Sequence, residues 1–196
     1  MPGFDYDART ALIVVDVQND FADPAGSLHV PGGTEVVPFI NEQISFAEAA
    51  GASIVYTQDW HPETTPHFAK DGGIWPTHCV ATTWGSEFHN DLIIAGPSVK
   101  KGTGGEDGYS GFTVRDPESG DEAATELEAM LRDYGTVRVA IAGLATDYCV
   151  KSTALDAASL GFETTLLADG VRAVNLAPGD GTRAVAEMVT AGVRVS

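Results

Sequence analysis

Short runs of apolar and β-branched residues alternate along the chain with segments in which apolar residues recur every three or four positions. The apolar runs predict buried strands at 11–15, 53–57, 98–100, 137–143, 162–168 and 193–195. The segments with helical spacing predict helices at 34–50, 121–134, 147–160 and 179–191. Because this alternation is typical of a parallel sheet covered on both faces, we predict a three-layer α/β/α fold with a six-stranded parallel sheet.

Length and composition are those of one globular domain. The chain has 196 residues, of which 43% are hydrophobic and 20% are charged. It contains no internal repeat, low-complexity tract or linker that would mark a second domain, so we interpret residues 1–196 as a single domain. The irregular segment 59–97 is rich in Gly, Pro, Trp and His, and loops of that length inside a compact domain are usually functional.

The charge of the chain argues against some classes of partner. Its 11 Lys and Arg residues oppose 28 Asp and Glu residues, which gives a formal charge of -17. Nucleic acids and anionic membrane surfaces require a basic face, so the sequence predicts neither as a partner. The lack of a transmembrane-length apolar stretch and of a signal peptide predicts a cytoplasmic location. There Cys79 and Cys149 should be free thiols, and a homo-oligomer is left open.

Three of the five histidines and one carboxylate fall within a proline-broken window after the second predicted strand: Asp59, His61, His67 and His78. Imidazole nitrogen together with carboxylate oxygen suits Zn, Fe or Mn better than Mg or Ca. The window begins at the carboxyl end of a strand, where open α/β sheets build their sites. One such histidine alone would more often be structural, but the set meets the usual ligand count. We therefore predict one divalent transition metal ion here.

Three strand ends present an acid, a cation and a thiol. Asp16 ends the first predicted strand, Lys101 follows the third, and Cys149 lies in the turn after the fourth. If these strands are adjacent, the three groups meet at one edge of the sheet, where a helix N-terminus and an ammonium would both stabilise a thiolate. Plainer interpretations are a turn cap for Asp16, a surface lysine for Lys101 and, equally favoured by the spacing, a core residue for Cys149.

Aromatic residues lie close in sequence to these candidate reactive groups. Phe21, Trp60, Trp75 and Tyr109 would suit a flat aromatic substrate, although for each one alone core packing is the favoured explanation. The glycine-rich stretch 102–111 lacks the spacing of a phosphate-binding loop and does not lead directly into a helix. We interpret residues 109–112 as lining a pocket or supporting a loop.

The chain carries several motifs in an order that resembles one known family. They are VDVQNDF at 15–21, DWH at 59–61 with His67, WPTHCV at 75–80, KG at 101–102, YSGF at 109–112 and GLATDYCV at 143–150. Over residues 11–195 the chain resembles the nicotinamidase/pyrazinamidase group of the isochorismatase-like cysteine hydrolases. Tyr148 departs from the pattern, because some members carry His at this position, so one wall of the pocket would differ.

The resemblance implies a catalytic triad of Asp16, Lys101 and Cys149. Lys101 is preferred to Lys100 because the family's lysine precedes a glycine. The resemblance also implies a cis peptide bond between Leu144 and Ala145, a bond that is rare before a residue other than proline. The backbone N–H groups of Ala145 and Cys149 would then form the oxyanion hole.

The same resemblance implies where a metal and a substrate bind. Asp59, His61 and His78 would hold the metal, which is Zn, Fe or Mn in different members, with His67 as a further ligand in some. The metal would bind the pyridine nitrogen of the substrate or orient it through water. The slot for the substrate ring would be lined by Phe21, Trp75 and Tyr109.

The implied activity is hydrolysis of a small aromatic amide: nicotinamide to nicotinate and ammonia, through a thioester on Cys149, with pyrazinamide as a second substrate. The enzymatic alternative is a cysteine amidase acting on a carbamoyl or ureido compound, but such relatives generally lack the histidine cluster. Isochorismate hydrolysis is a weaker alternative for the function, since that reaction does not need Cys149. A non-catalytic metal-binding module could share the fold. The presence of acid, lysine and thiol together argues against it.

Overall fold

The structure is a computed structural model, and it describes residues 4–196. Its centre is a six-stranded parallel sheet, as the sequence predicts. From one edge to the other, the strands are β3 (Ser98–Lys101), β2 (Ser53–Asp59), β1 (Thr10–Val15), β6 (Arg138–Leu144), β7 (Glu163–Arg172) and β8 (Arg194–Val195).

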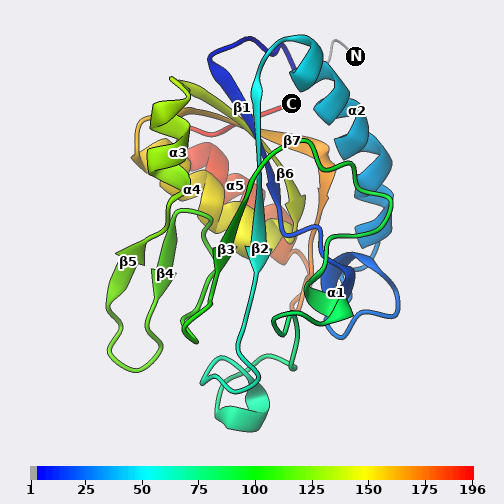
Figure 1. The fold of residues 1–196 in the computed structure, drawn as a ribbon, viewed down its shortest axis with the longest axis vertical. Helices are drawn as coiled ribbons and strands as arrows, with labels where there is room; N and C mark the ends of the chain where they lie inside the picture. The colour runs from blue at the N-terminus through cyan, green and yellow to red at the C-terminus, as the bar shows by residue number, and fades with distance from the viewer. Residues whose placement is uncertain (1–3) are drawn as a thin grey trace.

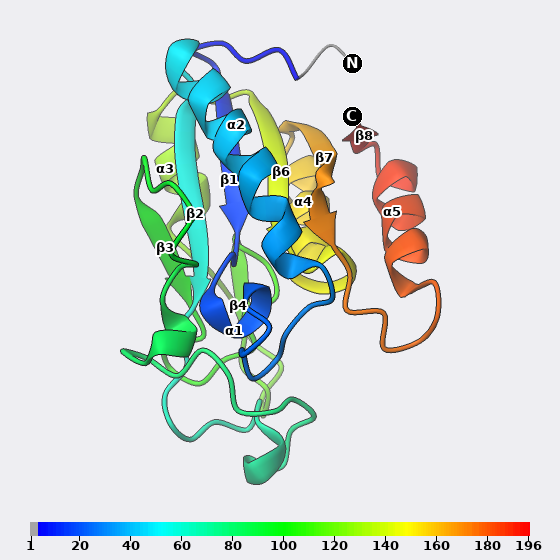
Figure 2. The same ribbon diagram turned by 90° about the vertical axis from the view of Figure 1, so that its right-hand side faces the viewer.

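Helices cover both faces of the sheet and complete three layers (Figure 2). α2 (Val36–Ala49) packs on one face, while α3 (Leu127–Asp133), α4 (Lys151–Ser159) and α5 (Asp180–Thr190) lie on the other. All six residues of β1 are buried, and its alternating side chains divide between two hydrophobic clusters. A strand that is buried on both faces must be apolar throughout, which explains the unbroken run from residue 11 to residue 15.

The helix predicted at 121–134 is wrong in its first part. Residues Glu122–Ala124 form strand β5, which pairs antiparallel with β4 (Thr113–Arg115), and only Leu127–Asp133 is helical. Glu and Ala favour helices, but pairing with β4 overrides that local preference. Between the two elements, the Thr125 hydroxyl accepts a hydrogen bond from the backbone N–H of Leu127.

The helix predicted at 147–160 begins with a different geometry. Residues Thr146–Val150 form a π-helical turn, and the regular helix α4 starts only at Lys151. Such π-turns are rare in proteins, and those that do occur frequently lie at functional sites. A further short helix, α1 (Asn19–Ala22), follows β1. Within residues 4–196, no helix is long and apolar enough to cross a membrane.

The strand order brings the candidate residues to one edge. The chain runs from β1 to β2 and β3 on one side, and then returns to β6 on the other side of β1. The order therefore reverses between β1 and β6, and such a switch point is where open α/β sheets bind ligands. The loops that follow β1, β2 and β3 gather at the lower end of the molecule in Figure 1.

Gly143 is required where β6 passes β1 near this edge. Its backbone is left-handed with φ 124°, and an added Cβ atom would lie 2.0 Å from the carbonyl oxygen of Val15. A side chain there would clash with a backbone atom that the parallel ladder holds in place.

We expect Gly143→Ala to lower the free energy of unfolding by about 3 kcal/mol, through the left-handed conformation and the clash together. Gly161→Ala is the matched control, since Gly161 has φ 86° and nothing within 4 Å of an added Cβ atom. Gly161→Ala should lower the free energy of unfolding by only about 1 kcal/mol. Urea unfolding of both variants measures the difference. Equal losses would show that the contact with Val15 is unimportant.

Candidate active site and metal centre

A buried lysine lies at the centre of the site. Lys101 is only 1% exposed, and its ammonium is 2.8 Å from Oδ2 of Asp16. It also donates hydrogen bonds to Oδ1 of Asp59 and to the carbonyl oxygen of Gly108. Burial lowers the pKa of Lys101, but the Asp16 and Asp59 carboxylates outweigh burial and raise it well above its ordinary value. The lysine is therefore a permanent cation.

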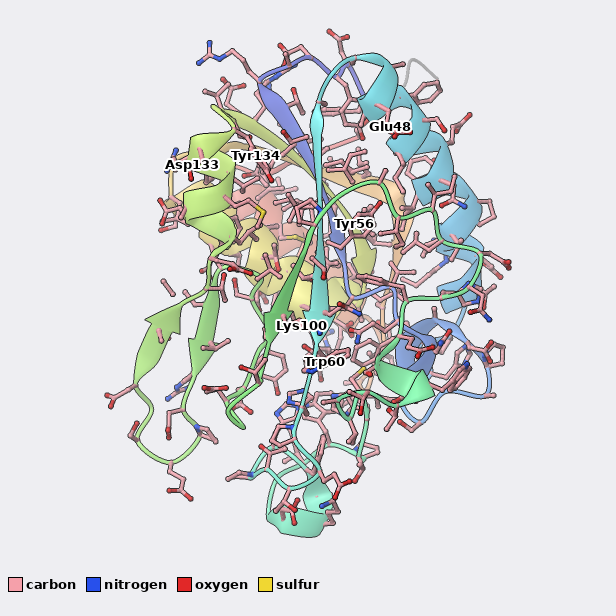
Figure 3. All side chains as sticks on the ribbon, viewed as in Figure 1. Glu48, Tyr56, Trp60, Lys100, Asp133 and Tyr134 are labelled. Carbon is pink, nitrogen blue, oxygen red and sulfur yellow. The ribbon has the colours of Figure 1, made fainter. Side chains whose placement is uncertain are left out.

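The two adjacent lysines point in opposite directions from β3. Lys100 is exposed and its ammonium lies 3.4 Å from the centre of the Trp60 ring, a cation–π contact (Figure 3). Because side chains alternate along a strand, Lys101 then points inward, toward Asp16 and Asp59. Of the two lysines that the sequence offers, Lys101 is the one the structure brings to the candidate site.

Cys149 lies beside that cation. It belongs to the π-helical turn after β6, and its sulfur is 3.7 Å from the Lys101 ammonium. Carboxylate oxygens of Asp16 and Asp59 lie within 4.8 Å of the same sulfur. The residue is 7% exposed and lines a small cavity, so it is reachable. The structure thus brings the three predicted triad residues together, each from a different strand end.

The peptide bond between Leu144 and Ala145 is cis, which confirms the prediction. Ala145 and Cys149, the two residues predicted for the oxyanion hole, both line the cavity.

Asp16 has an unusual backbone and an unusual acidity. Its φ of 49° is left-handed, which is uncommon for a residue other than glycine and costs on the order of 1–3 kcal/mol. The Thr57 hydroxyl donates a 2.6 Å hydrogen bond to its Oδ1. Burial raises the pKa of Asp16 to about 6, although the Lys101 ammonium opposes that rise. Near neutral pH it is a carboxylate with the affinity for protons that suits a general base.

The Cys149 thiol is protonated at rest. Burial raises its pKa well above the ordinary value, and the Asp16 and Asp59 carboxylates raise it further, while Lys101 lowers it. The helix terminus and the ammonium that the sequence offers as thiolate-stabilising groups do not suffice to lower the pKa of Cys149, because burial and the two nearby carboxylates together outweigh them. A nucleophilic thiolate would therefore have to form by proton transfer to a base, and Asp16 is within reach.

The predicted metal ligands converge near the cavity that Cys149 lines. Nitrogen atoms of His61, His67 and His78 all lie within 4.8 Å of one another. Oδ2 of Asp59 is 3.7 Å from Nε2 of His61 and 3.8 Å from Nε2 of His78. Donor atoms that share one ion at about 2 Å are separated by roughly 3 to 4 Å, so one ion fits among these groups.

The hydrogen bonds of the histidines test whether a metal suits the cluster. His61 is fully buried, yet neither of its ring nitrogens has a hydrogen-bond partner among the described residues. An unpaired buried ring nitrogen costs free energy unless it binds something. Nδ1 of His78 is 2.7 Å from the carbonyl oxygen of Pro76, so it carries the proton and leaves Nε2 as a donor atom. The residues fit a metal ion.

Burial keeps two of these rings neutral, the state that binds metal. It lowers the pKa of His78 to about 4 and lowers the pKa of His67 as well, although carboxylates near each ring oppose the shift. For Asp59, burial raises the pKa, but the Lys101 ammonium together with His61 and His78 outweighs burial and holds the pKa below its ordinary range. Asp59 is therefore an anion that both the lysine and a metal can share.

Aromatic side chains line the cavity between the cysteine and the histidines. The indole N–H of Trp75 donates a 2.7 Å hydrogen bond to the hydroxyl oxygen of Tyr109. Tyr148 packs edge-on against Trp75 with ring centroids 4.9 Å apart. The cavity walls include the predicted ring-slot residues and several aliphatic ones: Phe21, Trp75, Tyr109, Leu28, Val30 and Val174. The predicted fourth aromatic, Trp60, does not line this cavity and instead lies against Lys100.

Two residues near the site have no role in the sequence analysis. The Gln18 side-chain amide donates to the Asp59 carbonyl and accepts from the Asp59 N–H, both at 2.8 Å, so it fixes the backbone of a metal ligand. Asp107 lies 2.5 Å from Nδ1 of His67. The signal for Gln18 is its place two residues after Asp16, within a family motif. Asp107 lies in a glycine-rich stretch whose sequence gives no such signal.

Comparisons with known proteins show the family to which the chain belongs. Residues 10–196 match a family model described as the isochorismatase domain. The nicotinamidase/pyrazinamidase of Mycobacterium tuberculosis is 39% identical, with 94% of this chain and 97% of that protein covered. Two solved structures are also similar. A pyrazinamidase of Pyrococcus horikoshii in complex with zinc has TM-score 0.85 and 44% identity, covering 96% of this chain and 98% of that one. PnC1 from L. infantum in complex with nicotinate has TM-score 0.87 and 35% identity, covering 98% and 95%.

Removing the charge of Asp16 should lower the pKa of Cys149, because Asp16 raises that pKa and Lys101 then acts on the thiol with less opposition. In Asp16→Asn we expect alkylation of Cys149 by iodoacetamide at pH 8 to become at least several-fold faster, and its midpoint to move to lower pH. Both proteins carry Cys79→Ala, so that one thiol remains. A slower reaction in Asp16→Asn would contradict the charge argument.

Proposed function

The chain belongs to the isochorismatase family, and on that premise we propose that it is a nicotinamidase, a cysteine amidohydrolase that converts nicotinamide to nicotinate and ammonia. One observation carries this proposal: Cys149 and two members of the histidine cluster, His67 and His78, line one cavity whose walls include aromatic side chains. A flat heteroaromatic amide would place its carboxamide at the thiol and its ring against the aromatic wall. Pyrazinamide has the same shape and is proposed as a second substrate.

The first half of the reaction acylates the cysteine. Asp16 takes the proton of Cys149 as the thiol attacks the carboxamide carbon, and Lys101 stabilises the negative charge on sulfur. The backbone N–H groups of Ala145 and Cys149 are proposed to bind the oxyanion. Collapse of the tetrahedral intermediate breaks the C–N bond, Asp16 returns its proton to nitrogen, and ammonia leaves a thioester on Cys149.

The second half releases the acid. A water molecule replaces ammonia beside the thioester, and Asp16 removes a proton from it as it attacks the carbonyl carbon. The C–S bond then breaks, and the same proton restores the thiol, so that nicotinic acid leaves, loses its carboxyl proton to solvent to give nicotinate, and the site returns to its resting protonation state. Asp16 thus acts as base and acid in turn, a role that fits a carboxyl group with a pKa of about 6.

The metal centre would be held by Asp59, His61 and His78, with His67 as a fourth ligand. When bound, a divalent ion supplies a Lewis-acid centre at the wall of the ring slot, suited to the ring nitrogen of the substrate. Imidazole and carboxylate donors support a transition metal, and we propose Zn, Fe or Mn. The pyrazinamidase of Pyrococcus horikoshii is in complex with zinc, so zinc is the first ion to test.

Cys149→Ala should reduce ammonia release from nicotinamide by at least about a thousandfold, because the nucleophile is lost. Cys79→Ala is the matched control: Cys79 is also a buried thiol, but it does not line the cavity. Ammonia release is measured with a coupled assay on purified, metal-loaded protein. Similar activity in Cys149→Ala and the control would overturn the assignment of the nucleophile.

His61→Ala should remove most of the bound metal and raise KM for nicotinamide, because His61 contributes a buried nitrogen that has no other partner in the described chain. Metal content is measured by mass spectrometry after dialysis. His29→Ala provides the control, since His29 is not a member of the cluster. Unchanged metal content in His61→Ala would exclude His61 as a ligand.

A further inference from the structure

Asp107 contacts the metal cluster without belonging to it. Its Oδ1 atom is 2.5 Å from Nδ1 of His67, and its side chain is 27% exposed while the His67 side chain is 5% exposed. Every carboxylate oxygen of an ionised aspartate accepts hydrogen bonds and none donates, so the proton in this contact belongs to His67. The other ring nitrogen, Nε2, is then left as the one with a lone pair.

The direction of that lone pair matters because the three histidines are restrained differently. Pro76 holds the ring of His78 through its carbonyl oxygen, whereas His61 has no hydrogen-bond partner among the described residues. His67 lies in the irregular loop after β2, where no regular element fixes a side chain. Its ring stacks on the His61 ring with centroids 4.8 Å apart. Stacking sets the plane of the His67 ring but not the direction in which its nitrogen atoms point within that plane, so another contact must fix that direction.

The backbone around Asp107 is well placed to provide that contact. Its N–H and carbonyl groups pair with the backbone of Arg115, the last residue of β4 in the β4–β5 hairpin, over 2.8 and 2.9 Å. Two residues earlier, the carbonyl oxygen of Gly105 accepts a 2.7 Å hydrogen bond from the buried Thr65 hydroxyl. Thr65–Gly105 and His67–Asp107 therefore join the same two loops at matched positions, two residues apart on each.

We propose that Asp107 is a positioning residue of the metal centre: it holds the proton on Nδ1 of His67 and directs Nε2 of that ring toward the ion. A carboxylate in this position also makes the ligating nitrogen more basic, which strengthens the bond to a metal. The inference rests on the proposed metal site, and it makes the contribution of the fourth ligand, His67, depend on a residue outside the ligand set. It also gives the β4–β5 hairpin a function, as the support of that residue.

The test measures zinc affinity by competition with a chromophoric chelator, with no substrate present. Asp107→Ala should raise the zinc dissociation constant about tenfold or more, in the range found when such outer partners are removed. Its backbone pairing with Arg115 does not involve the side chain, so the loop should keep its place. Glu106→Ala is the matched control, because Glu106 precedes it and its carboxylate binds only the nearby N–H of Gly104. Equal weakening in both variants would overturn the proposal.

A double-mutant cycle shows whether Asp107 acts through His67. In a His67→Ala background, Asp107→Ala should change zinc affinity by less than about twofold, because the ring it orients is absent. Asp107→Asn keeps a hydrogen-bond acceptor and should lose less affinity than Asp107→Ala. If Asp107→Ala still weakens zinc binding tenfold in the His67→Ala background, Asp107 does not act through His67 and the inference is refuted. If His61→Ala also retains zinc, the proposed metal site itself fails, which is a separate result.

Discussion

The ion pairs of Lys101 are the constraint on which the rest of the site depends. One ammonium lies between two buried carboxylates, and it is the only cation within hydrogen-bond reach of both Asp16 and Asp59 in the described chain. Leaving either carboxylate unpaired at this depth would cost several kcal/mol. Lys101 therefore links the candidate nucleophile and base to the candidate metal ligands. Its positive charge acts on both halves of the site, which also share a cavity.

The sheet supplies this arrangement through its register. Asp59 on β2 and Lys101 on β3 are paired positions of neighbouring parallel strands. The backbone N–H of Asp16, which directly follows β1, donates a hydrogen bond to the carbonyl oxygen of Thr57 on β2. Cys149 comes from beyond β6, on the other side of β1. Four strands thus deliver four groups to one edge: Asp59 and Lys101 are held in the sheet ladder itself, while Asp16 directly follows β1 and Cys149 lies in the π-helical turn after β6. Placement on strand ends gives a precision that mobile loops would lack.

Much of this could be predicted from the sequence, because the buried strands are continuous apolar runs and the reactive residues follow them directly. Asp16, Lys101 and Cys149 could each be placed at or just beyond a strand end, but their meeting at one edge was conditional on neighbouring strands, which the order β3-β2-β1-β6 supplies. Asp107 could not, because nothing in a glycine-rich stretch indicates which carboxylate meets a histidine forty residues away. The β4–β5 hairpin was missed for a related reason: its Glu and Ala residues favour a helix, and only pairing with a distant segment makes them a strand.

The resting protonation state of Cys149 has a consequence for the life of the protein in a cell. Peroxides and other electrophiles react with thiolates and hardly at all with thiols. A cysteine whose pKa is held well above its ordinary value by burial and two carboxylates is therefore poorly reactive until a substrate fills the cavity and Asp16 takes its proton. Burial and the same carboxylates should therefore make the resting Cys149 slower to form sulfenic acid than a cysteine that is kept as a thiolate.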